Sequence, residues 1–272
     1  MGIERARFHR HTNAYVAPHR TGYYMRRFDA FCSLLPPREN MRIFNTGCGS
    51  GELASRLSEA GHVVVGSDRS PYMIERAIAN APQCEFMVGG VEDIPGNNWD
   101  VIAALDVLPY VSADEEAEFF LAAAGSLKPD GAIVFSHGNM LVDLVTFNRY
   151  TVEFWRDCII PYITSDEAER ESLLAAIRGC LTYGNEPQIS ADRKSERDRL
   201  PKRRINPLSY PASLAKFGLR VEASLFTRYY PMPPQWADAH DPDLSLAFED
   251  AFKQNDLSIL FGSVMMMRAV KA

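Results

Sequence analysis

Cysteine is scarce in this chain, and its spacing excludes the usual cysteine-based sites. The five cysteines form no Cys-x-x-Cys pair and lie far apart, at Cys32, Cys48, Cys84, Cys158 and Cys180. An odd number of widely spaced cysteines argues against a disulfide framework and against a zinc site, and it is typical of a reducing compartment. We therefore expect a cytoplasmic protein without a metal site.

Long hydrophobic runs and an excess of positive charge are also lacking. No apolar run approaches the roughly 20 residues that a membrane-spanning helix needs, and residues 1–7 lack the apolar stretch of a signal peptide. The formal net charge is -6, so no overall basic field points to nucleic acid. We expect no membrane and no nucleic-acid partner, and the sequence leaves the oligomeric state open.

A glycine-rich segment is the most informative feature that the chain does have. Gly47, Gly49 and Gly51 follow a short apolar run, and Asp68 ends the next apolar run, at 63–68. This order predicts a strand, a glycine turn, a helix and a second strand that ends in a carboxylate. An open α/β sheet holds a nucleoside in this way, because glycines let the backbone approach the ligand and the acid accepts hydrogen bonds from ribose hydroxyls.

The spacing of the glycines indicates the kind of nucleoside. A dinucleotide site usually reads G-x-G-x-x-G, with a helix N-terminus that faces a pyrophosphate. Here the spacing is G-x-G-x-G, and Glu52 follows directly. An acid at this point suits a ligand that has a positive centre and no phosphate.

Apolar runs alternate with helical patterns up to residue 137, which predicts right-handed crossovers and a parallel sheet. Ser70-Pro71 reads as the start of one of these helices, with a serine cap and a proline in the first turn. Lys128 to Gly131 reads as a turn. The expected strands lie at 41–45, 62–67, 85–88, 99–106, 131–136, 219–226 and 259–270.

The alternation stops between residues 138 and 206. Met140–Tyr162 and Asp166–Leu181 have helical patterns, and 185–204 is highly charged. We interpret the charged stretch as a solvated loop, with a mobile lid as the alternative. The predicted parts are N-terminal lid helices at 1–40, a core at 41–137, a helical cap insert at 138–206 and a C-terminal part of the core sheet at 207–272.

Four segments together resemble the class I S-adenosylmethionine (SAM)-dependent methyltransferases. They are the glycine motif, Asp68, the run 88–95, which looks like the family's adenine-binding loop, and the run 99–111, which looks like its fourth strand and the loop after it. The resemblance covers 41–137 and loosely 207–270. It implies an α/β fold with a seven-stranded, mostly parallel, doubly wound sheet, an antiparallel last strand and a mainly helical cap insert after strand five. It also implies SAM as the cofactor.

The same resemblance implies how SAM is held. Asp68 would bind the ribose diol, Met73 would pack on the adenine, and Asp106 would lie below the sulfonium. The family often has an acid where this chain has Gly90, so Glu92, Asp93 or a water molecule would take the adenine amino group. The full expected set is Asn45, Gly47, Cys48, Gly49, Gly51, Asp68, Met73, Val91, Glu92, Asp106, Tyr15 and Arg20.

The members of this set have different expected roles. Asn45 and the first two glycines would lie against the methionine part of SAM, and Val91 would offer its backbone N–H to the adenine. We interpret Cys48 as a small turn residue rather than a nucleophile. Tyr15 and Arg20 belong to the N-terminal segment that would fold over the same face.

Three polar residues follow strands four and five, at the edge of the sheet where α/β proteins bind their ligands. They are Tyr110, His137 and Asn139. His137 is the first candidate for a general base because histidine titrates near neutrality, with a hydrogen-bonded loop histidine as the alternative. The run 228–230, Arg-Tyr-Tyr, is a candidate wall for an anionic substrate, with plain surface as the alternative.

These features predict a SAM-dependent methyltransferase that acts on an O, N or C atom of a small molecule, such as a sugar, an amino acid or a specialised metabolite. The length of the insert favours a small or medium substrate, by analogy between folds. A nucleic-acid acceptor is not expected, because 106–110 is one residue longer than a D-P-P-Y loop and lacks its second proline.

Two alternatives stay open. In the first, an aromatic cage holds the sulfonium and Asn139 orients the amine of SAM, which attacks its own γ-carbon. That reaction would give an azetidine-type ring and 5′-methylthioadenosine. In the second, the protein binds SAM without turnover.

Overall fold

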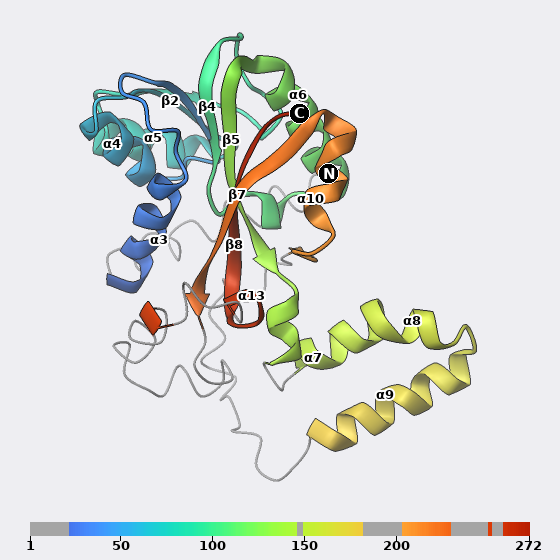
Figure 1. Cartoon of the computed structure of the whole chain (residues 1–272). Helices are drawn as coiled ribbons and strands as arrows, with labels where there is room; N and C mark the ends of the chain where they lie inside the picture. The colour runs from blue at the N-terminus through green and yellow to red at the C-terminus, as the bar shows by residue number, and fades with distance from the viewer. Residues whose placement is uncertain (1–21, 146–148, 182–202, 230–249, 252–257) are drawn as a thin grey trace. The chain divides into compact units, whose positions relative to one another are not determined.

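The computed structural model describes residues 22–145, 149–181, 203–229, 250–251 and 258–272 (Figure 1). The chain divides into two compact units, and the first consists of 1–138, 195–225 and 264–272. The second consists of 139–194 and 226–263. None of the helices within the described ranges combines the length and the apolar character needed to cross a membrane.

A mixed sheet is the centre of the fold, and it confirms the predicted fold class. Its strand order is β3-β2-β1-β4-β5-β8-β7, and the short β6 pairs with β5. The pairs β1–β2, β1–β4, β2–β3 and β4–β5 are parallel, whereas β5 and β8 are antiparallel. The strands are β1 (Arg42–Thr46), β2 (Val63–Asp68), β3 (Glu85–Val88), β4 (Trp99–Ala104), β5 (Leu127–Asn139), β6 (Arg204–Ile205), β7 (Leu219–Tyr229) and β8 (Gly262–Lys271).

The central strand β4 is buried along its whole length. A strand of a parallel sheet that is covered on both faces reads as a continuous apolar run, which is why the sequence revealed it. The predicted turn at 128–131 is wrong, because β5 already begins at Leu127. The pairing passes from Trp99 with Leu127 to Val101 with Ala132, so an irregularity in the register takes up the residues that read as a turn.

One helix start in the first unit follows the predicted cap chemistry, and a second has a capping box. The side chain of Ser70 accepts a hydrogen bond from the N–H of Met73, and Pro71 is the first residue of α5 (Pro71–Asn80). Ser112 and Glu115 form a reciprocal capping box at the start of α6 (Ala113–Ser126). The other helical segments of this unit are α3 (Gly22–Ser33), α4 (Glu52–Glu59), α10 (Tyr210–Leu214) and the 3₁₀ turns η2 (Leu108–Tyr110) and η7 (Ala215–Phe217).

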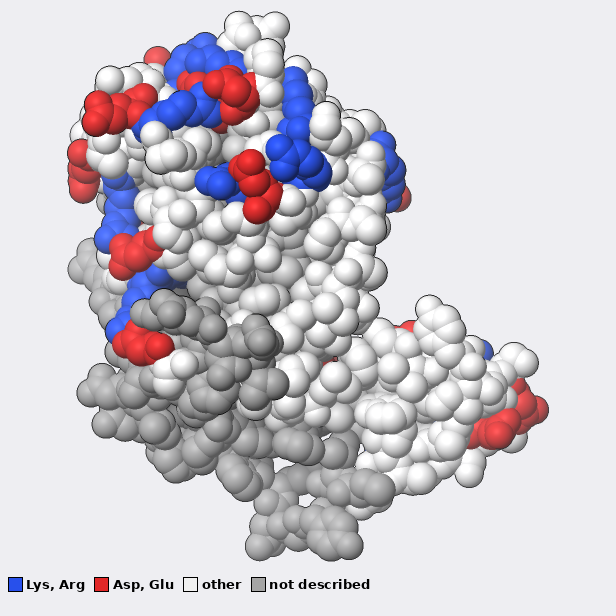
Figure 2. All heavy atoms as spheres, in the orientation of Figure 1, with Lys and Arg blue, Asp and Glu red and all other residues white. Residues whose placement is uncertain are grey.

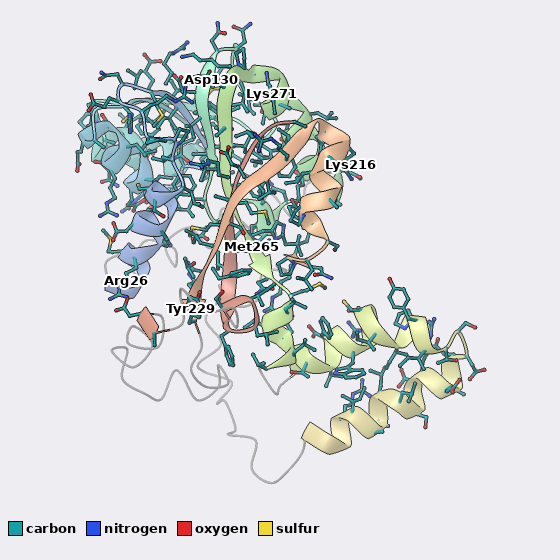
Figure 3. All side chains as sticks on the ribbon, in the orientation of Figure 1. Arg26, Asp130, Lys216, Tyr229, Met265 and Lys271 are labelled. Atoms are coloured by element: carbon teal, nitrogen blue, oxygen red, sulfur yellow. The ribbon has the colours of Figure 1, made fainter. Side chains whose placement is uncertain are left out.

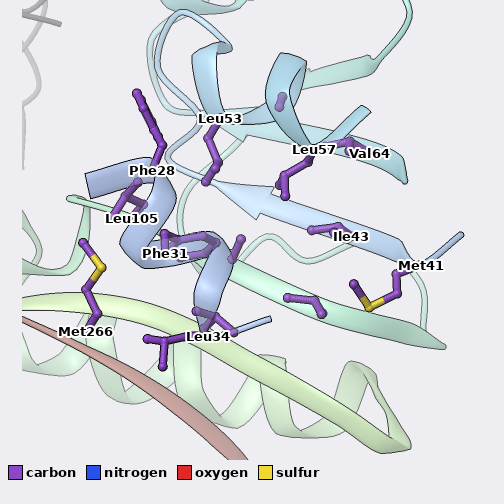
Figure 4. Packing of buried hydrophobic residues seen from close by; sticks show 14 of the residues in the cluster. Phe28, Phe31, Leu34, Met41, Ile43, Leu53, Leu57, Val64, Leu105 and Met266 are labelled. Atoms are coloured by element: carbon purple, nitrogen blue, oxygen red, sulfur yellow. The ribbon is translucent and has the colours of Figure 1, made fainter. Parts of the chain in front are cut away.

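The core of the first unit joins α3 to the sheet and to α4 (Figure 4). Phe31 of α3 is fully buried, and it lies in one cluster with Ile43 of β1 and Leu57 of α4. Met266 of β8 belongs to the same cluster, so the last strand closes the core. On the face shown in Figure 2, acidic and basic side chains are interspersed, so this face carries no field of a single sign.

The second unit is mainly helical where it is described. Its helix α9 (Glu167–Leu181) packs against α7 (Arg149–Phe154) and α8 (Ile160–Ile163), and Leu174, Phe154 and Ile160 are buried. A π-helical turn at 155–159 comes between α7 and α8. Pro161 follows this turn, and proline has no N–H with which to continue a regular ladder.

The remaining short helical segments of the second unit are η3 (Leu141–Leu144) and α13 (Ser258–Phe261). Several predicted features lie outside the described residues, namely Tyr15, Arg20, Tyr230 and the charged stretch up to residue 202.

Candidate functional site

The glycine loop after β1 has a left-handed backbone at each of its glycines. The φ angles are 61° at Gly47, 55° at Gly49 and 86° at Gly51. A Cβ atom on Gly47 would lie 2.5 Å from a methyl group of Val107, so the loops after β1 and β4 are in close contact. At Gly49, by contrast, a Cβ atom would meet no described atom within 4 Å. The middle glycine therefore borders open space, as a loop that receives a ligand must.

The end of β2 holds this loop in place. The carboxylate of Asp68 accepts a hydrogen bond from the N–H of Gly49 at 3.0 Å and one from the N–H of Ser70 at 2.9 Å. The N–H of Cys48 also donates to the carbonyl of Ser67. The two bonds from Gly49 and Ser70 fix the orientation of the Asp68 carboxylate at the end of β2.

Cys48 itself has no nucleophilic character in this environment. Its side chain is buried, and burial together with the charge of Asp68 raises the pKa of the thiol well above its usual value. The thiolate is the reactive form of cysteine, so a buried thiol of this kind is inert. The interpretation of Cys48 as a small turn residue agrees with this geometry.

The loop after β3 lies beside the same edge of the sheet. The N–H of Gly89 donates to the carbonyl of Asp68, and Val91 is buried. Asp93 accepts a hydrogen bond from the N–H of Gly90 at 2.8 Å, so its carboxylate serves the loop itself. Glu92 differs, because its Oε2 atom is buried and has no hydrogen-bond partner among the described residues. Of these two acids, Glu92 is the one with a buried acceptor atom that no described residue satisfies.

A second buried polar atom without a partner lies at the end of β1. Asn45 pairs with Gly66 of β2 and Ala103 of β4, and only 2% of its surface is exposed. Its Nδ2 group finds no acceptor in the described part of the chain. A buried polar group without a partner costs about 1–3 kcal/mol. One orphaned donor and one orphaned acceptor near an open glycine loop fit a ligand that has both an acceptor and an amino group, as SAM has.

Asp106 lies just beyond β4, in a left-handed conformation with φ 58°. Its N–H donates to the hydroxyl of Ser136 at 2.7 Å, and its Oδ2 lies 3.2 Å from a guanidinium nitrogen of Arg27. Arg27 belongs to α3 and is buried. Sequence reasoning missed Arg27 because no motif surrounds it, although it lies within a segment that was expected to be helical.

His137 is buried and hydrogen-bonded, which favours the alternative of a hydrogen-bonded histidine over the predicted general base. The side chain is fully buried on β5, and its Nε2 lies 3.1 Å from Oε2 of Glu116 on α6. A carboxylate only accepts, so Nε2 carries the proton, and the buried Nδ1 has no partner among the described residues. An acceptor molecule has no access to this imidazole in the structure.

The carboxylate of Glu116 accepts hydrogen bonds from three side chains, and one of these bonds gives the buried His137 a polar partner. Besides His137, it accepts hydrogen bonds from Tyr210 on α10 and from Arg203, whose Nη1 lies at 2.7 Å. Burial by itself would raise the pKa of the Glu116 carboxyl, but the hydrogen bonds from His137 and Tyr210 and the charge of Arg203 hold it below the usual value. Burial and the neighbouring Glu116 raise the pKa of the Tyr210 hydroxyl far above its usual value.

The side chain of Asn139 is also engaged in internal hydrogen bonds, which give no support to its predicted catalytic role. Its Nδ2 donates to the carbonyls of Ile259 at 2.6 Å and Gly262 at 2.8 Å, and its Oδ1 accepts from the N–H of Leu141. The residue is fully buried within the second unit. These bonds use both amide hydrogens, so the side chain anchors the start of η3 to the segment before β8.

The other predicted residues are buried, half-buried or outside the described part of the chain. Met73 is buried in the first turn of α5, and Gly51 packs closely against Ala77. Tyr110 is half-buried in η2, beyond β4. Tyr229 is fully buried in β7, so it forms no surface wall; Figure 3 labels it on this strand. Tyr15 and Arg20 lie outside the described residues.

Comparison with known proteins agrees with this geometry. Residues 43–131 match the family described as "Methyltransferase domain". The ubiquinone biosynthesis O-methyltransferase of Brucella anthropi is 24% identical over 216 residues, which cover 77% of this chain and 72% of that protein. The protein of the same name from Azorhizobium caulinodans is 30% identical over 138 residues, 47% of this chain and 53% of its own length.

Solved structures show the same fold. The magnesium protoporphyrin IX methyltransferase of Synechocystis, with S-adenosylhomocysteine (SAH) bound, superimposes with a TM-score of 0.57 at 14% identity. The match covers 99% of this chain and 100% of that one. Residues 43–131 are thus similar to a methyltransferase domain, and the chain shares its fold with an SAH-bound methyltransferase.

Proposed function

We propose that this protein transfers the methyl group of SAM to an oxygen atom of a small-molecule acceptor. The observation that carries the proposal is the pair of orphaned buried atoms, Nδ2 of Asn45 and Oε2 of Glu92, at the edge of the sheet where Gly49 borders open space. The curated relatives are named as O-methyltransferases of ubiquinone biosynthesis, which favours a hydroxyl acceptor over an amine or a carbon atom.

The residues present suit each part of SAM. The carboxylate of Asp68 suits the ribose hydroxyls by its chemistry, and its bonds to the N–H groups of Gly49 and Ser70 fix its orientation. Glu92 can accept from the adenine amino group, which replaces the contact that Gly90 cannot make. Asn45 can donate to the carboxylate of the methionine part. Together these contacts would compensate for the desolvation of the two buried groups.

The chemistry asks the protein mainly to position the acceptor. When bound, SAM supplies an electrophilic methyl group on a positively charged sulfur. The chain must hold the acceptor oxygen in line with that group, exclude water and provide acidic side chains near the positive charge. Asp106 is one such side chain, and Arg27 and Ser136 fix its position beyond β4.

Tyr110 is the candidate for contact with the acceptor molecule. With His137 and Asn139 committed to internal contacts, Tyr110 is the predicted catalytic residue that still lies at the carboxyl edge of the sheet. We propose that Tyr110 contacts the acceptor. This position beyond β4 is on the side of the sheet edge where the loops after β1 and β4 meet.

The intramolecular attack on SAM loses its support in this geometry. That reaction needed a side chain to orient the amine of SAM, and the amide of Asn139 is saturated by backbone groups. The comparisons likewise lead to methyltransferases. Methyl transfer to a second molecule is therefore the function that the site supports best.

Mass spectrometry of the products would test this proposal. The purified protein is incubated with SAM alone, and with SAM and a panel of phenols, catechols, amines and thiols. We expect SAH and a product with one added methyl group only when a hydroxyl acceptor is present. Release of 5′-methylthioadenosine from SAM alone would overturn the proposal, and methylation of amines only would remove the preference for oxygen.

A further inference from the structure

A cavity of about 270 Å³ lies within the first unit, between α6, β6 and the α10–η7 segment. Its lining shares no residue with the glycine loop, with Asp68 or with the loop after β3. The volume is near the lower end of the roughly 300–1,000 Å³ that small-molecule sites occupy. Nothing in the methyl-transfer reaction described above uses this cavity.

One part of the cavity wall is aromatic and aliphatic. Phe120 of α6 and Phe217 of η7 are stacked, with ring centroids 5.6 Å apart and an interplanar angle of 26°. Leu214 and Ile205 are buried beside them and also line the cavity. Such a wall suits the apolar body of a small ligand, since each buried CH₂ group contributes about 0.8 kcal/mol.

The other part of the wall is polar, with two basic residues and one acid. Arg203 and Lys216 line the cavity together with Glu116. The carboxylate of Glu116 is already neutralised, because Arg203 pairs with it and His137 and Tyr210 donate to it. The charge that remains for a ligand is therefore positive.

Two cationic side chains line the cavity, which favours an anion. The side chain of Arg203 donates its hydrogen bonds within the described part of the chain through Nη1. The acceptors are the carbonyls of Val111 and Ser112 and the carboxylate of Glu116. The other guanidinium nitrogens of Arg203 have no acceptor in the described part of the chain. Lys216, which Figure 3 labels beside α10, is exposed and lies 5.0 Å above the ring of Phe217. A carboxylate suits such a pair of donors.

We propose that this cavity is a second ligand site, which takes a small carboxylic acid with an aromatic or aliphatic body. The body would lie on the Phe120–Phe217 wall, and the carboxylate would bind Arg203 and Lys216. The hydroxyl of Ser209 at the same cavity can donate a further hydrogen bond to the carboxylate. The proposal does not depend on which molecule is methylated.

Arg203 also contacts the loop beyond β4, which lies at the edge of the sheet where we propose that SAM binds. We call the SAM-binding residues proposed above, Asn45, Asp68 and Glu92 with the glycine loop, the cofactor cradle. The N–H of Arg203 donates to the carbonyl of Pro109 at 2.7 Å, and its side chain bonds the next turn of the chain, at 111–112. The segment 107–112 includes Val107, which contacts Gly47, and Tyr110. Arg203 thus contacts the loop beyond β4, while the cavity shares no lining residue with the glycine loop or Asp68.

The test uses phenylacetate as the probe and phenylacetamide as its neutral match. Binding is followed by ligand-observed and ¹⁵N-detected NMR titration of the full chain, because a ligand this small binds weakly. We expect binding of phenylacetate that weakens at least fivefold for the amide and for Lys216→Gln. Arg220→Gln changes the charge equally outside the cavity and should leave the affinity unchanged.

A variant that fills the cavity distinguishes phenylacetate binding in the cavity from phenylacetate binding elsewhere on the protein. Ala113 lines the cavity from the exposed first turn of α6, and Ala113→Trp fills the space without removing a polar contact. We expect this variant to lose phenylacetate binding while SAH still binds. No detectable phenylacetate binding, equal binding of the amide, or unchanged binding by Ala113→Trp would each overturn the proposal. Competition between phenylacetate and SAH in the native chain would also overturn it, by placing the probe in the cofactor cradle.

Discussion

At the scale of single residues, Asp68 has two tasks that one substitution tests together. Its carboxylate orients the N–H groups of Gly49 and Ser70, and we propose that it also accepts from the ribose. Asp68→Ala removes both, so we expect SAH binding to weaken at least tenfold, or by about 1.4 kcal/mol or more. Isothermal titration calorimetry measures this directly. Unchanged affinity would remove the cofactor from this place, and Glu75→Ala, elsewhere on α5, serves as the control.

Glu92 and Asp93 are neighbouring acids with different expected roles, which makes them a matched pair. Oε2 of Glu92 is buried without a partner, whereas Asp93 accepts from the N–H of Gly90. We expect Glu92→Gln to weaken SAH binding severalfold, because it replaces an acceptor by a donor in front of the adenine amino group. Asp93→Asn keeps an acceptor for Gly90 and should bind SAH normally. Equal losses in both variants would contradict the assignment of Glu92.

At the scale of elements, the glycine loop separates a backbone effect from a ligand effect. Gly49 and Gly61 both have positive φ angles, and a Cβ atom at either meets nothing within 4 Å. An alanine in this conformation costs about 1 kcal/mol. We expect Gly49→Ala and Gly61→Ala to lower the free energy of unfolding in urea alike, while only Gly49→Ala weakens SAH binding. A similar loss of binding in both would show that Gly49 acts through stability alone.

The elements were also the part of the molecule that the sequence predicted best. Ser70-Pro71 and Ser112-x-x-Glu115 mark helix starts because cap chemistry is local, and β4 is an unbroken apolar run because both of its faces are covered. The irregular pairing at 128–131 depends on a neighbouring strand, so the local sequence reads as a turn instead.

In the candidate site too, contiguous motifs could be predicted from the sequence, whereas contacts between residues distant along the chain could not. The glycine loop and Asp68 are contiguous motifs, and the sequence identified them. The partners of His137 and Asn139 come from Glu116, Ile259 and Gly262, which are distant along the chain. No local pattern in the sequence predicts these internal hydrogen bonds of His137 and Asn139, because both partners of each bond must be known.

At the scale of the whole molecule, the buried cluster around Glu116 predicts a dependence of stability on pH. The pKa of Tyr210 is raised in the folded state, so the folded protein keeps a proton that an unfolded tyrosine loses above a pKa of about 10. The contribution of Tyr210 is therefore complete below pH 10 and falls above it, by about 1.4 kcal/mol per pH unit. We expect Tyr210→Phe to flatten this fall in urea unfolding between pH 9 and 11. Tyr162→Phe, at a residue that is 91% exposed, should keep it.

Binding of SAH should also raise the free energy of unfolding of the first unit, because all residues of the proposed cofactor cradle belong to that unit. Trp99 is buried in this unit, and the double variant Trp155→Phe, Trp236→Phe leaves it as the single tryptophan. At an SAH concentration of 100 times Kd, we expect the unfolding free energy reported by Trp99 fluorescence to rise by about 2.7 kcal/mol.

The same experiment with Asp68→Ala in that background gives the decisive comparison. If the substitution weakens binding tenfold, the same SAH concentration is only about 10 times Kd, and the gain falls to about 1.4 kcal/mol. An equal gain in both proteins would mean that SAH binds away from Asp68. No gain in either would mean that the first unit does not hold the cofactor, because a ligand that binds only the folded state must stabilise it.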